Sequence, residues 1–232
     1  MNDSVIEKLK GGLIVSCQSE GNDPFNESPS YMSLFARAAF QGGAIGFRSE
    51  GIEKIRSIKN STSLPVIGLL KNTYDDGLVR ITGSFDEVEQ LISVGTDIIA
   101  IDGTYRKRDG NYTGPEFIKE VKNRYGCLVL ADIATCEEAI ACEVNGADAI
   151  STTLSGYTPD TLNRNNGLPD YDLLKAVVSE VNLPVFAEGR YNIPVQAREA
   201  MALGAFSVIV GTAITRPRVI ASWFVEEIKK CL

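Results

Sequence analysis

Lys71 and Glu188 are the residues of this 232-residue chain whose types and settings best suit proton transfer. Lys71 follows the apolar run 64–70, and Glu188 follows the apolar residues 185–187. An amine whose stem crosses an apolar layer loses hydration, which lowers its pKa. The neutral amine that results is the form needed by a general base or a Schiff-base nucleophile, and a nearby carboxylate can exchange a proton or bind a ligand.

Simpler roles are open to both residues. Lys71 could extend along its flexible stem into bulk water, and Glu188 could form a structural ion pair with Arg48 or Arg190. The chain contains no histidine, which excludes Ser–His and Cys–His nucleophiles and histidine-ligated metals. Acid–base chemistry must therefore use Lys, Asp, Glu, Tyr or Cys.

Glycine and arginine come together after two late segments, the largely apolar residues 185–188 and the apolar run 207–210. Backbone N–H groups near glycine and a guanidinium group are donors that suit phosphate. The alternative is that the arginines of residues 216–218 merely begin a solvated helix. We predict an anion site formed by Gly189, Arg190, Gly211, Thr212 and Arg216.

Two aspartates also end apolar runs. Asp102 and Asp132 could be paired metal ligands, but without histidine or an obvious third ligand we expect no catalytic metal. Binding ligand hydroxyl or amide groups is the plainer role for Asp132. A short basic run, residues 104–108, follows Asp102, and such runs are most often solvated faces.

The elements that must position these residues alternate along the whole chain. Short, nearly continuous apolar runs are typical of parallel strands covered by helices, and amphipathic segments lie between them. About eight such units, with no break in composition, predict an α/β fold: one closed (β/α)8 TIM-barrel domain over residues 1–232 with a short N-terminal helix. The predicted strands are 13–17, 44–48, 65–70, 98–102, 127–132, 149–152, 184–188 and 207–210, and the predicted helices are 30–41, 85–94, 115–124, 136–145, 171–181, 194–203 and 220–231.

A doubly wound open sheet is the competing fold, and the absence of G-x-G-x-x-G after the first strand weighs against it. In a barrel, the polar residues at the strand ends would meet at one mouth. Three long connections, residues 72–83, 103–114 and 153–169, follow strands and would lie at that mouth too. We interpret them as lids rather than as solvated insertions.

Composition limits the partners and the setting. The net charge is −7, which argues against a nucleic-acid or anionic-membrane partner. The five cysteines show no C-x-x-C spacing and indicate reduced thiols rather than disulfides or a zinc site. No apolar run could cross a bilayer, and residues 1–10 lack the apolar core of a signal peptide, so we expect a cytoplasmic protein.

These strand ends, taken in order, resemble the N-acetylmannosamine-6-phosphate 2-epimerase family of bacterial sialic-acid catabolism. The resemblance covers essentially the whole chain and rests on GLIVSCQ (12–18), AIGFR (44–48), PVIGLLK (65–71), IDGT (101–104), LADIA (130–134), STTLSGYT (151–158), FAEGR (186–190) and VGTAITRP (210–217). It implies a TIM barrel without a cofactor that interconverts N-acetylmannosamine 6-phosphate and N-acetylglucosamine 6-phosphate. It further implies Lys71 as the general acid/base at C2, Glu188 as its partner near C1, Gln18, Arg48 and Asp132 as substrate ligands, and Arg190, Arg216 and the Gly211 backbone as anion contacts.

The implied chemistry needs neither a metal nor a nicotinamide. In the ring-opened sugar the C2 proton lies beside an aldehyde, so its removal gives an enolate, and its return to the other face inverts C2. A single lysine, a Lys/Glu pair and a substrate hydroxyl all remain compatible with the residues. The rival functions are a Schiff-base aldolase that uses Lys71 and a non-catalytic phosphosugar-binding regulator. One exposed apolar helix face would allow a homodimer.

Overall fold

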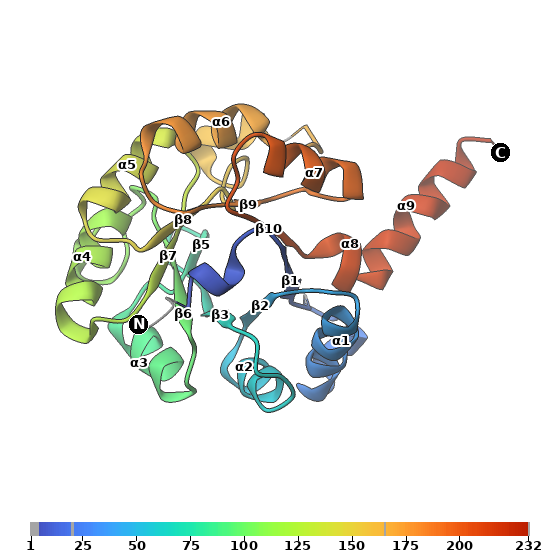
Figure 1. The fold of residues 1–232 in the computed structure, drawn as a ribbon, viewed down its shortest axis with the longest axis horizontal. Helices are drawn as coiled ribbons and strands as arrows, with labels where there is room; N and C mark the ends of the chain where they lie inside the picture. The colour runs from blue at the N-terminus through green and yellow to red at the C-terminus, as the bar shows by residue number, and fades with distance from the viewer. Residues whose placement is uncertain (1–4, 20, 165, 232) are drawn as a thin grey trace.

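Eight parallel strands form a closed barrel in the computed structural model, which describes residues 5–19, 21–164 and 166–231. Their order around the barrel is β1-β10-β9-β8-β7-β6-β3-β2, and helices surround them (Figure 1). The predicted (β/α)8 barrel is therefore confirmed, although the outermost predicted positions, 1 and 232, lie outside the described residues. The strands are β1 (Leu13–Cys17), β2 (Gly46–Glu50), β3 (Val66–Leu69), β6 (Ile98–Asp102), β7 (Val129–Asp132), β8 (Ala149–Ser151), β9 (Val185–Glu188) and β10 (Ser207–Val210).

The helices begin where capping residues precede amphipathic segments. Ser84 and Thr135 each accept a backbone N–H while a glutamate three residues on bonds back, which satisfies the free donors of a helix start. Helix α2 falls in a segment where no helix was predicted. The α-helices are α1 (Ser30–Gln41), α2 (Ile52–Lys59), α3 (Phe85–Ser93), α4 (Gly114–Tyr125), α5 (Cys136–Val144), α6 (Tyr171–Glu180), α7 (Pro194–Ala202), α8 (Thr212–Thr215) and α9 (Pro217–Lys229), and the 3-10 helices are η1 (Glu7–Leu9), η2 (Pro24–Asn26), η3 (Asp109–Asn111) and η4 (Pro159–Arg164).

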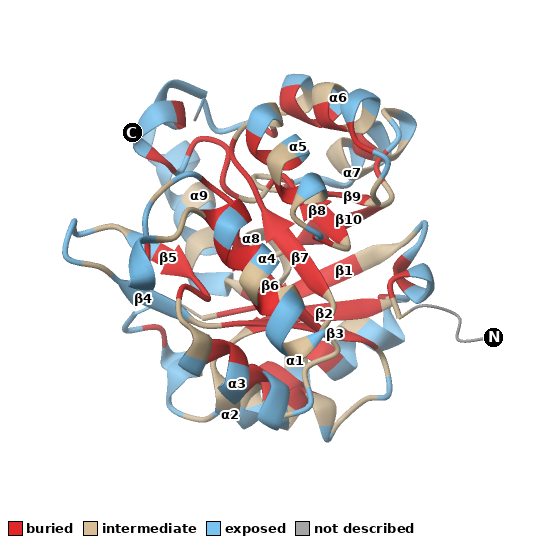
Figure 2. Ribbon diagram, turned by 90° about the vertical axis from the view of Figure 1, so that its left-hand side faces the viewer, coloured by how far each residue is buried: buried red, intermediate tan, exposed pale blue. Residues whose placement is uncertain are grey.

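The core has two layers because each strand is covered on both faces (Figure 2). The outer layer lies between the strands and the helices. The inner layer fills the barrel with side chains such as Ile14, Ile67 and Phe186. Leu9 of η1, the predicted short N-terminal helix, packs so closely over Gly46 that a Cβ there would lie 2.3 Å from the leucine. The leucine thus closes the barrel at the amino ends of its strands.

A second, two-stranded antiparallel sheet stands at the opposite end. It consists of β4 (Lys71–Thr73) and β5 (Val79–Ile81), with Lys71 paired to Ile81. The prediction that residues 72–83 form a long loop was therefore wrong in part, because the turn before Gly77 folds this segment into a hairpin. Lys71 likewise does not end barrel strand β3, as predicted, but begins β4.

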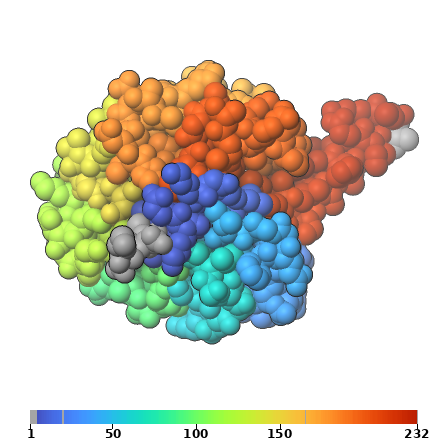
Figure 3. Space-filling model, in the orientation of Figure 1, coloured from blue at the N-terminus to red at the C-terminus, as the bar shows by residue number. Residues whose placement is uncertain are grey.

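Helix α9 leaves the barrel instead of packing along it (Figures 1 and 3). None of its residues is buried, and Phe224 and Ile228 are 68% and 62% exposed. Within the described residues, no helix combines the length and the apolar character that crossing a membrane requires.

Candidate active site

A pocket of about 550 Å³ opens at the carboxyl ends of the barrel strands. All three long connections contribute to its wall, through Leu78 and Val79, through Arg106, and through Tyr157. Every predicted site residue except Asp132 lines it: Gln18, Arg48, Lys71, Glu188, Gly189, Arg190, Gly211, Thr212 and Arg216. The side chains predicted to cooperate therefore share one cavity.

The floor of the pocket is an ion cluster centred on Arg48 of β2. Its Nη1 and Nη2 donate to Oδ1 and Oδ2 of Asp132 at 2.8 and 2.6 Å, and Nη1 lies 3.0 Å from Oε2 of Glu188. Arg48 and Asp132 are almost fully buried. Burial alone would disfavour the guanidinium charge, but the two carboxylates outweigh it and raise the pKa of Arg48. Glu188 thus pairs with Arg48 and not with Arg190.

Asp132 was predicted to touch the ligand, and the structure places it out of reach. Both of its oxygens are occupied by Arg48, and Thr153 Oγ1 lies 2.7 Å from Oδ1. Its exposed fraction is 0%. We therefore assign Asp132 the task of holding Arg48 and Thr153 in place.

Thr153 connects the two carboxylates by a hydroxyl group that has only one proton. Its Oγ1 lies 2.7 Å from Asp132 Oδ1 and 2.8 Å from Glu188 Oε2. One hydroxyl cannot donate to both oxygens at once. If Glu188 is protonated, each of the two hydrogen bonds has one donor, since Glu188 donates to Thr153 and Thr153 donates to Asp132.

The environment of Glu188 favours that protonated form. Loss of hydration in the floor of the pocket raises the pKa of Glu188, and the charge of Asp132 raises it further. Arg48, Thr153 and Lys71 act in the opposite direction. The net direction is upward, so Glu188 holds a proton at higher pH than an ordinary glutamate does.

Lys71 approaches from the hairpin side of the pocket. Its Nζ donates to Oε1 of buried Gln18 at 2.9 Å, and the Gln18 amide nitrogen in turn donates to Ser16 Oγ. That second bond fixes the amide, so that its carbonyl oxygen faces the amine. Lys71 itself remains accessible from the cavity.

The charge balance at Lys71 favours the neutral amine. The protein atoms around Nζ reduce its hydration, which lowers its pKa, and the positive charges of Arg48 and Arg216 lower it further. Glu50 and Glu188 oppose this shift but do not reverse it. The direction agrees with the expectation from the sequence that an amine beside an apolar layer has a lowered pKa.

The predicted anion contacts lie along the β9 and β10 rim of the pocket. Gly189 has φ +110°, a conformation that favours glycine, and a Cβ on Gly211 would lie 3.3 Å from the Ser16 Cβ. Arg216 Nη1 reaches Thr212 Oγ1 at 3.5 Å. Backbone and guanidinium groups thus line the same side of the cavity.

Arg190 lines the pocket but uses much of its hydrogen-bonding capacity on the chain. Its Nε and Nη1 donate to the carbonyl oxygens of Leu168 and Ser155 at 2.6 and 2.7 Å, and its guanidinium lies over the Tyr157 ring. The residue adopts φ +62°, which is uncommon outside glycine. It holds the 153–169 connection against β9.

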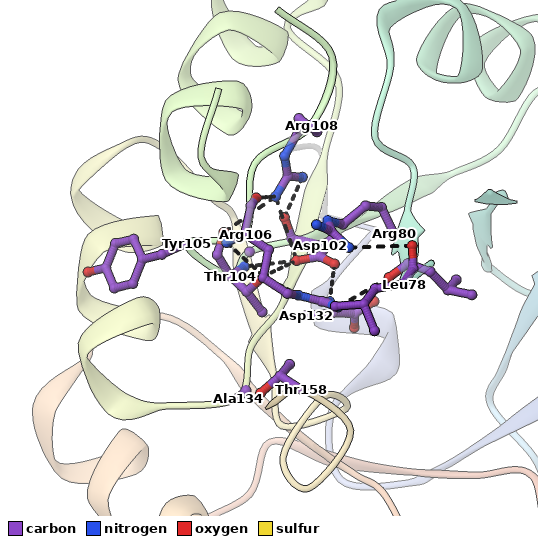
Figure 4. A network of polar contacts seen from close by, with 12 residues as sticks. Leu78, Arg80, Asp102, Thr104, Tyr105, Arg106, Arg108, Asp132, Ala134 and Thr158 are labelled. Carbon is purple, nitrogen blue, oxygen red and sulfur yellow. Dashed lines mark hydrogen bonds and ion pairs between the residues drawn. The ribbon is translucent and has the colours of Figure 1, made fainter. Parts of the chain in front are cut away.

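The basic run 104–108 is not the solvated face that was predicted. Arg108 is buried, and Arg106 lies on the pocket wall with its Nη2 2.5 Å from buried Asp102 Oδ2 (Figure 4). The carboxylate that directly precedes this run was the available signal. In the described part of the chain, no three His, Cys, Asp or Glu side chains gather as metal ligands would.

Comparisons with known proteins agree with this architecture. The family model described as "Putative N-acetylmannosamine-6-phosphate epimerase" matches residues 32–230. A protein of Clostridioides difficile strain 630, named "Putative N-acetylmannosamine-6-phosphate 2-epimerase", is 44% identical over 225 residues, covering 97% of this chain and 99% of its own. One of the same name from Caldanaerobacter subterraneus subsp. tengcongensis is 46% identical over 231 residues, covering 99% and 96%.

Solved structures show the same relationship. The structure of the N-acetylmannosamine-6-phosphate 2-epimerase from Clostridium perfringens superposes with a TM-score of 0.89 at 39% identity, with 97% of each chain covered. Thiamine phosphate pyrophosphorylase from Pyrococcus furiosus superposes with a TM-score of 0.61 at 18% identity, covering 91% of this chain and 89% of its own, and shares the fold alone.

Proposed function

The chain belongs to the N-acetylmannosamine-6-phosphate epimerase family, and we propose that it interconverts N-acetylmannosamine 6-phosphate and N-acetylglucosamine 6-phosphate by inverting C2. One observation carries the mechanism: Lys71, with a lowered pKa, and Glu188, with a raised pKa, line the same pocket. Environments that push two ionisable groups in opposite directions mark a base and an acid.

The first step is removal of the C2 proton from the ring-opened sugar by neutral Lys71. The C–H electron pair forms the C1–C2 double bond, and the negative charge moves to the aldehyde oxygen. The Glu188 proton, once it turns from Thr153 towards that oxygen, and the neighbouring Arg48 guanidinium stabilise the oxygen, and donors of this kind contribute a few kcal/mol each. The charge is thus neutralised as it forms.

The second step returns a proton to the opposite face of C2. In the simplest scheme the Lys71 ammonium donates it after the enolate turns within the pocket. In a two-base scheme Glu188 donates to C2, and in a substrate-assisted scheme a sugar hydroxyl relays the proton. The one-base and substrate-assisted schemes restore neutral Lys71 directly. In the two-base scheme the Lys71 ammonium must afterwards pass its proton through water to the Glu188 carboxylate, which restores the starting protonation states. No scheme requires a redox partner.

The opposite side of the pocket suits the 6-phosphate. The Arg216 guanidinium lines the pocket and supplies a positive charge there, and the backbone at Gly189, Gly211 and Thr212 allows close approach to N–H groups. Anchoring a remote phosphate leaves C2 between Lys71 and Glu188, which is how binding energy away from the reacting atom orients it. We assign the amino-sugar part to Gln18, Arg48 and the 153–157 segment.

A Schiff-base aldolase is the second candidate, because a lysine with a lowered pKa is also the nucleophile of that chemistry. Incubation of the enzyme with N-acetylmannosamine 6-phosphate in deuterated water, followed by NMR, separates the candidates. We expect deuterium at C2 in both epimers and no borohydride-trapped adduct on Lys71. Cleavage products with a trapped adduct would instead establish the aldolase, and binding without exchange would establish a regulator.

The location and the partners remain predictions. We expect a cytoplasmic enzyme of amino-sugar and sialic-acid catabolism, active without a cofactor and without nucleic-acid or membrane partners. A homodimer would cover the apolar side of α9, where Phe224 and Ile228 are exposed. Light scattering of the wild type and of the Phe224→Asp/Ile228→Asp variant tests this: we expect twice the chain mass in the first and the chain mass in the second. A monomeric wild type would contradict the prediction.

A further inference from the structure

The hairpin that carries Lys71 is joined to the neighbouring 103–114 connection by two arginines that reach in opposite directions (Figure 4). Arg80 of β5 donates from Nε to the Lys107 carbonyl oxygen at 3.1 Å. Arg106 donates from Nη1 to the Val79 carbonyl oxygen at 3.2 Å. Arg80 thus bonds to the residue that follows Arg106, and Arg106 bonds to the residue that precedes Arg80. We call these two reciprocal hydrogen bonds the clasp.

Arg106 connects this clasp to a fixed point of the barrel. Its Nη2 lies 2.5 Å from Oδ2 of Asp102, and its Nε donates to Thr104 Oγ1 at 3.0 Å. Asp102 ends β6, has no exposed surface, and also accepts from Thr104 and approaches Arg108. One planar guanidinium therefore spans a buried carboxylate, a loop hydroxyl and the hairpin backbone.

The hairpin needs such support. It has three paired positions, β4 is exposed while much of β5 is buried (Figure 2), and an isolated two-stranded sheet is marginally stable in water. Asn72 of β4 also donates to Glu87 of α3, which fixes the strand on its other side. The pocket side of the hairpin is held by Arg106, since both Arg106 and Val79 line the cavity.

We propose that Arg106 is a positioning residue, which holds the hairpin against the Asp102 end of β6 and thereby fixes the Lys71 amine over C2 of the substrate. The proposal rests on the proposed function, because it assigns Arg106 an effect that passes through Lys71. A displacement of about 1 Å at a reacting group can cost about a hundredfold in rate. Loss of the clasp is therefore expected to lower kcat more than it raises KM.

The clasp also influences the hydration of Lys71. The charged groups that act on its amine are Arg48 and Glu50 of β2, Glu188 of β9 and Arg216 before α9. Arg106 is not among them, so its removal changes no dominant charge at the amine. A hairpin that opens admits water to Nζ, which raises the pKa of Lys71 towards its ordinary value and moves the acidic limb of the pH profile to higher pH.

The test uses the full chain, with Arg106→Gln, Arg106→Lys and the surface control Arg56→Gln on α2. Lysine can still neutralise Asp102 but cannot also reach Val79, because it lacks the planar fork of donors. We expect kcat for C2 exchange to fall about 10- to 100-fold in both Arg106 variants, with KM within about threefold of wild type. We expect faster amide hydrogen exchange over residues 71–81, an upward shift of the acidic limb, and an unchanged Arg56→Gln enzyme.

The possible failures are distinguishable. A wild-type enzyme without C2 exchange would overturn the proposed function and this assignment with it. A raised KM with unchanged kcat would show that Arg106 binds the substrate instead. Wild-type kcat in Arg106→Lys would overturn the proposal, because neutralising Asp102 would then suffice. A lowered kcat with an unchanged pH profile and unchanged hydrogen exchange in the hairpin would overturn it too, because the hairpin would not have moved.

Discussion

The two sides of the pocket hold their reactive groups in different ways. Glu188 belongs to a barrel strand, and its carboxyl group contacts Arg48 and Thr153 in a floor that is almost fully buried. Lys71 begins a small hairpin outside the barrel, and its amine has a single hydrogen bond, to Gln18, among the bonds described for it. The proposed acid, Glu188, is fixed by a network, whereas the position of the proposed base, Lys71, depends on how the hairpin is held.

This difference suggests a division of labour. A buried network fixes the direction of a proton donor and the charge around it. A group on a hairpin can approach and withdraw, and if Lys71 delivers protons to both faces of C2, some relative movement of base and substrate is required.

The largest effect is expected from removing the base. Lys71→Ala should lower C2 exchange by about 10³-fold or more, within the range attributed to general acid–base groups. The fold should persist, because Lys71 is exposed to the cavity. NMR exchange assays and thermal unfolding measure the two effects, with Lys119→Ala on the surface of α4 as control. Substantial residual exchange in Lys71→Ala would contradict the role of Lys71 as base.

The next effect concerns the network side and is a loss of stability. Arg48→Met leaves Asp132 and Glu188 without their shared cation, and removal of one partner from a buried ion pair costs about 3–5 kcal/mol. Denaturant titration should show this as a reduced free energy of unfolding. Arg56→Met, at an exposed pair, should change it by about 0.5 kcal/mol or less. Equal losses in the two variants would mean that the floor is not a network of the kind described.

The smallest effect tests the charge around the Lys71 amine and not the position of the hairpin that carries it. Arg216→Gln removes a positive charge that lowers the pKa of Lys71, so that pKa rises and the neutral amine forms only at higher pH. The acidic limb of kcat/KM should therefore move to higher pH, and kcat/KM near pH 7 should fall about tenfold through weaker phosphate binding as well. Arg218→Gln, at the exposed neighbouring position, should leave both unchanged. Movement of the acidic limb to lower pH would contradict the conclusion that Arg216 lowers the pKa of Lys71.

Most of the fold could be predicted from the sequence because buried parallel strands leave continuous apolar runs. Each predicted barrel strand is present, and its ends lie within two residues of the prediction. Helix α2 was missed because eight residues with Ile52, Ile55 and Ile58 on one face give a short signal. The hairpin was missed although Asp76-Gly77 is a typical turn sequence, since the three-residue strands beside it are too short to show alternation.

The sequence could predict those site residues whose place in the pocket follows from their position in or just after a barrel strand. Gln18 directly after β1, Arg48 within β2 and Glu188 at the end of β9 meet in the pocket as the barrel requires. The sequence could not show that Arg48 would occupy both oxygens of Asp132, because that depends on packing across the barrel. Arg106 and Thr153 escaped notice for the same reason: their roles come from loops, whose course is not set by periodicity.

The leucine that closes the amino end of the barrel determines where ligands and water can enter the interior. With Leu9 over Gly46 and the interior filled by side chains, the barrel is closed at its amino end and open only at the carboxyl ends of its strands. Any ligand and solvent must then enter and leave past the same rim of loops. In the proposed reaction an enolate in this pocket meets bulk water only past these loops, so we expect movement of the loops to limit both turnover and the loss of the C2 proton to solvent.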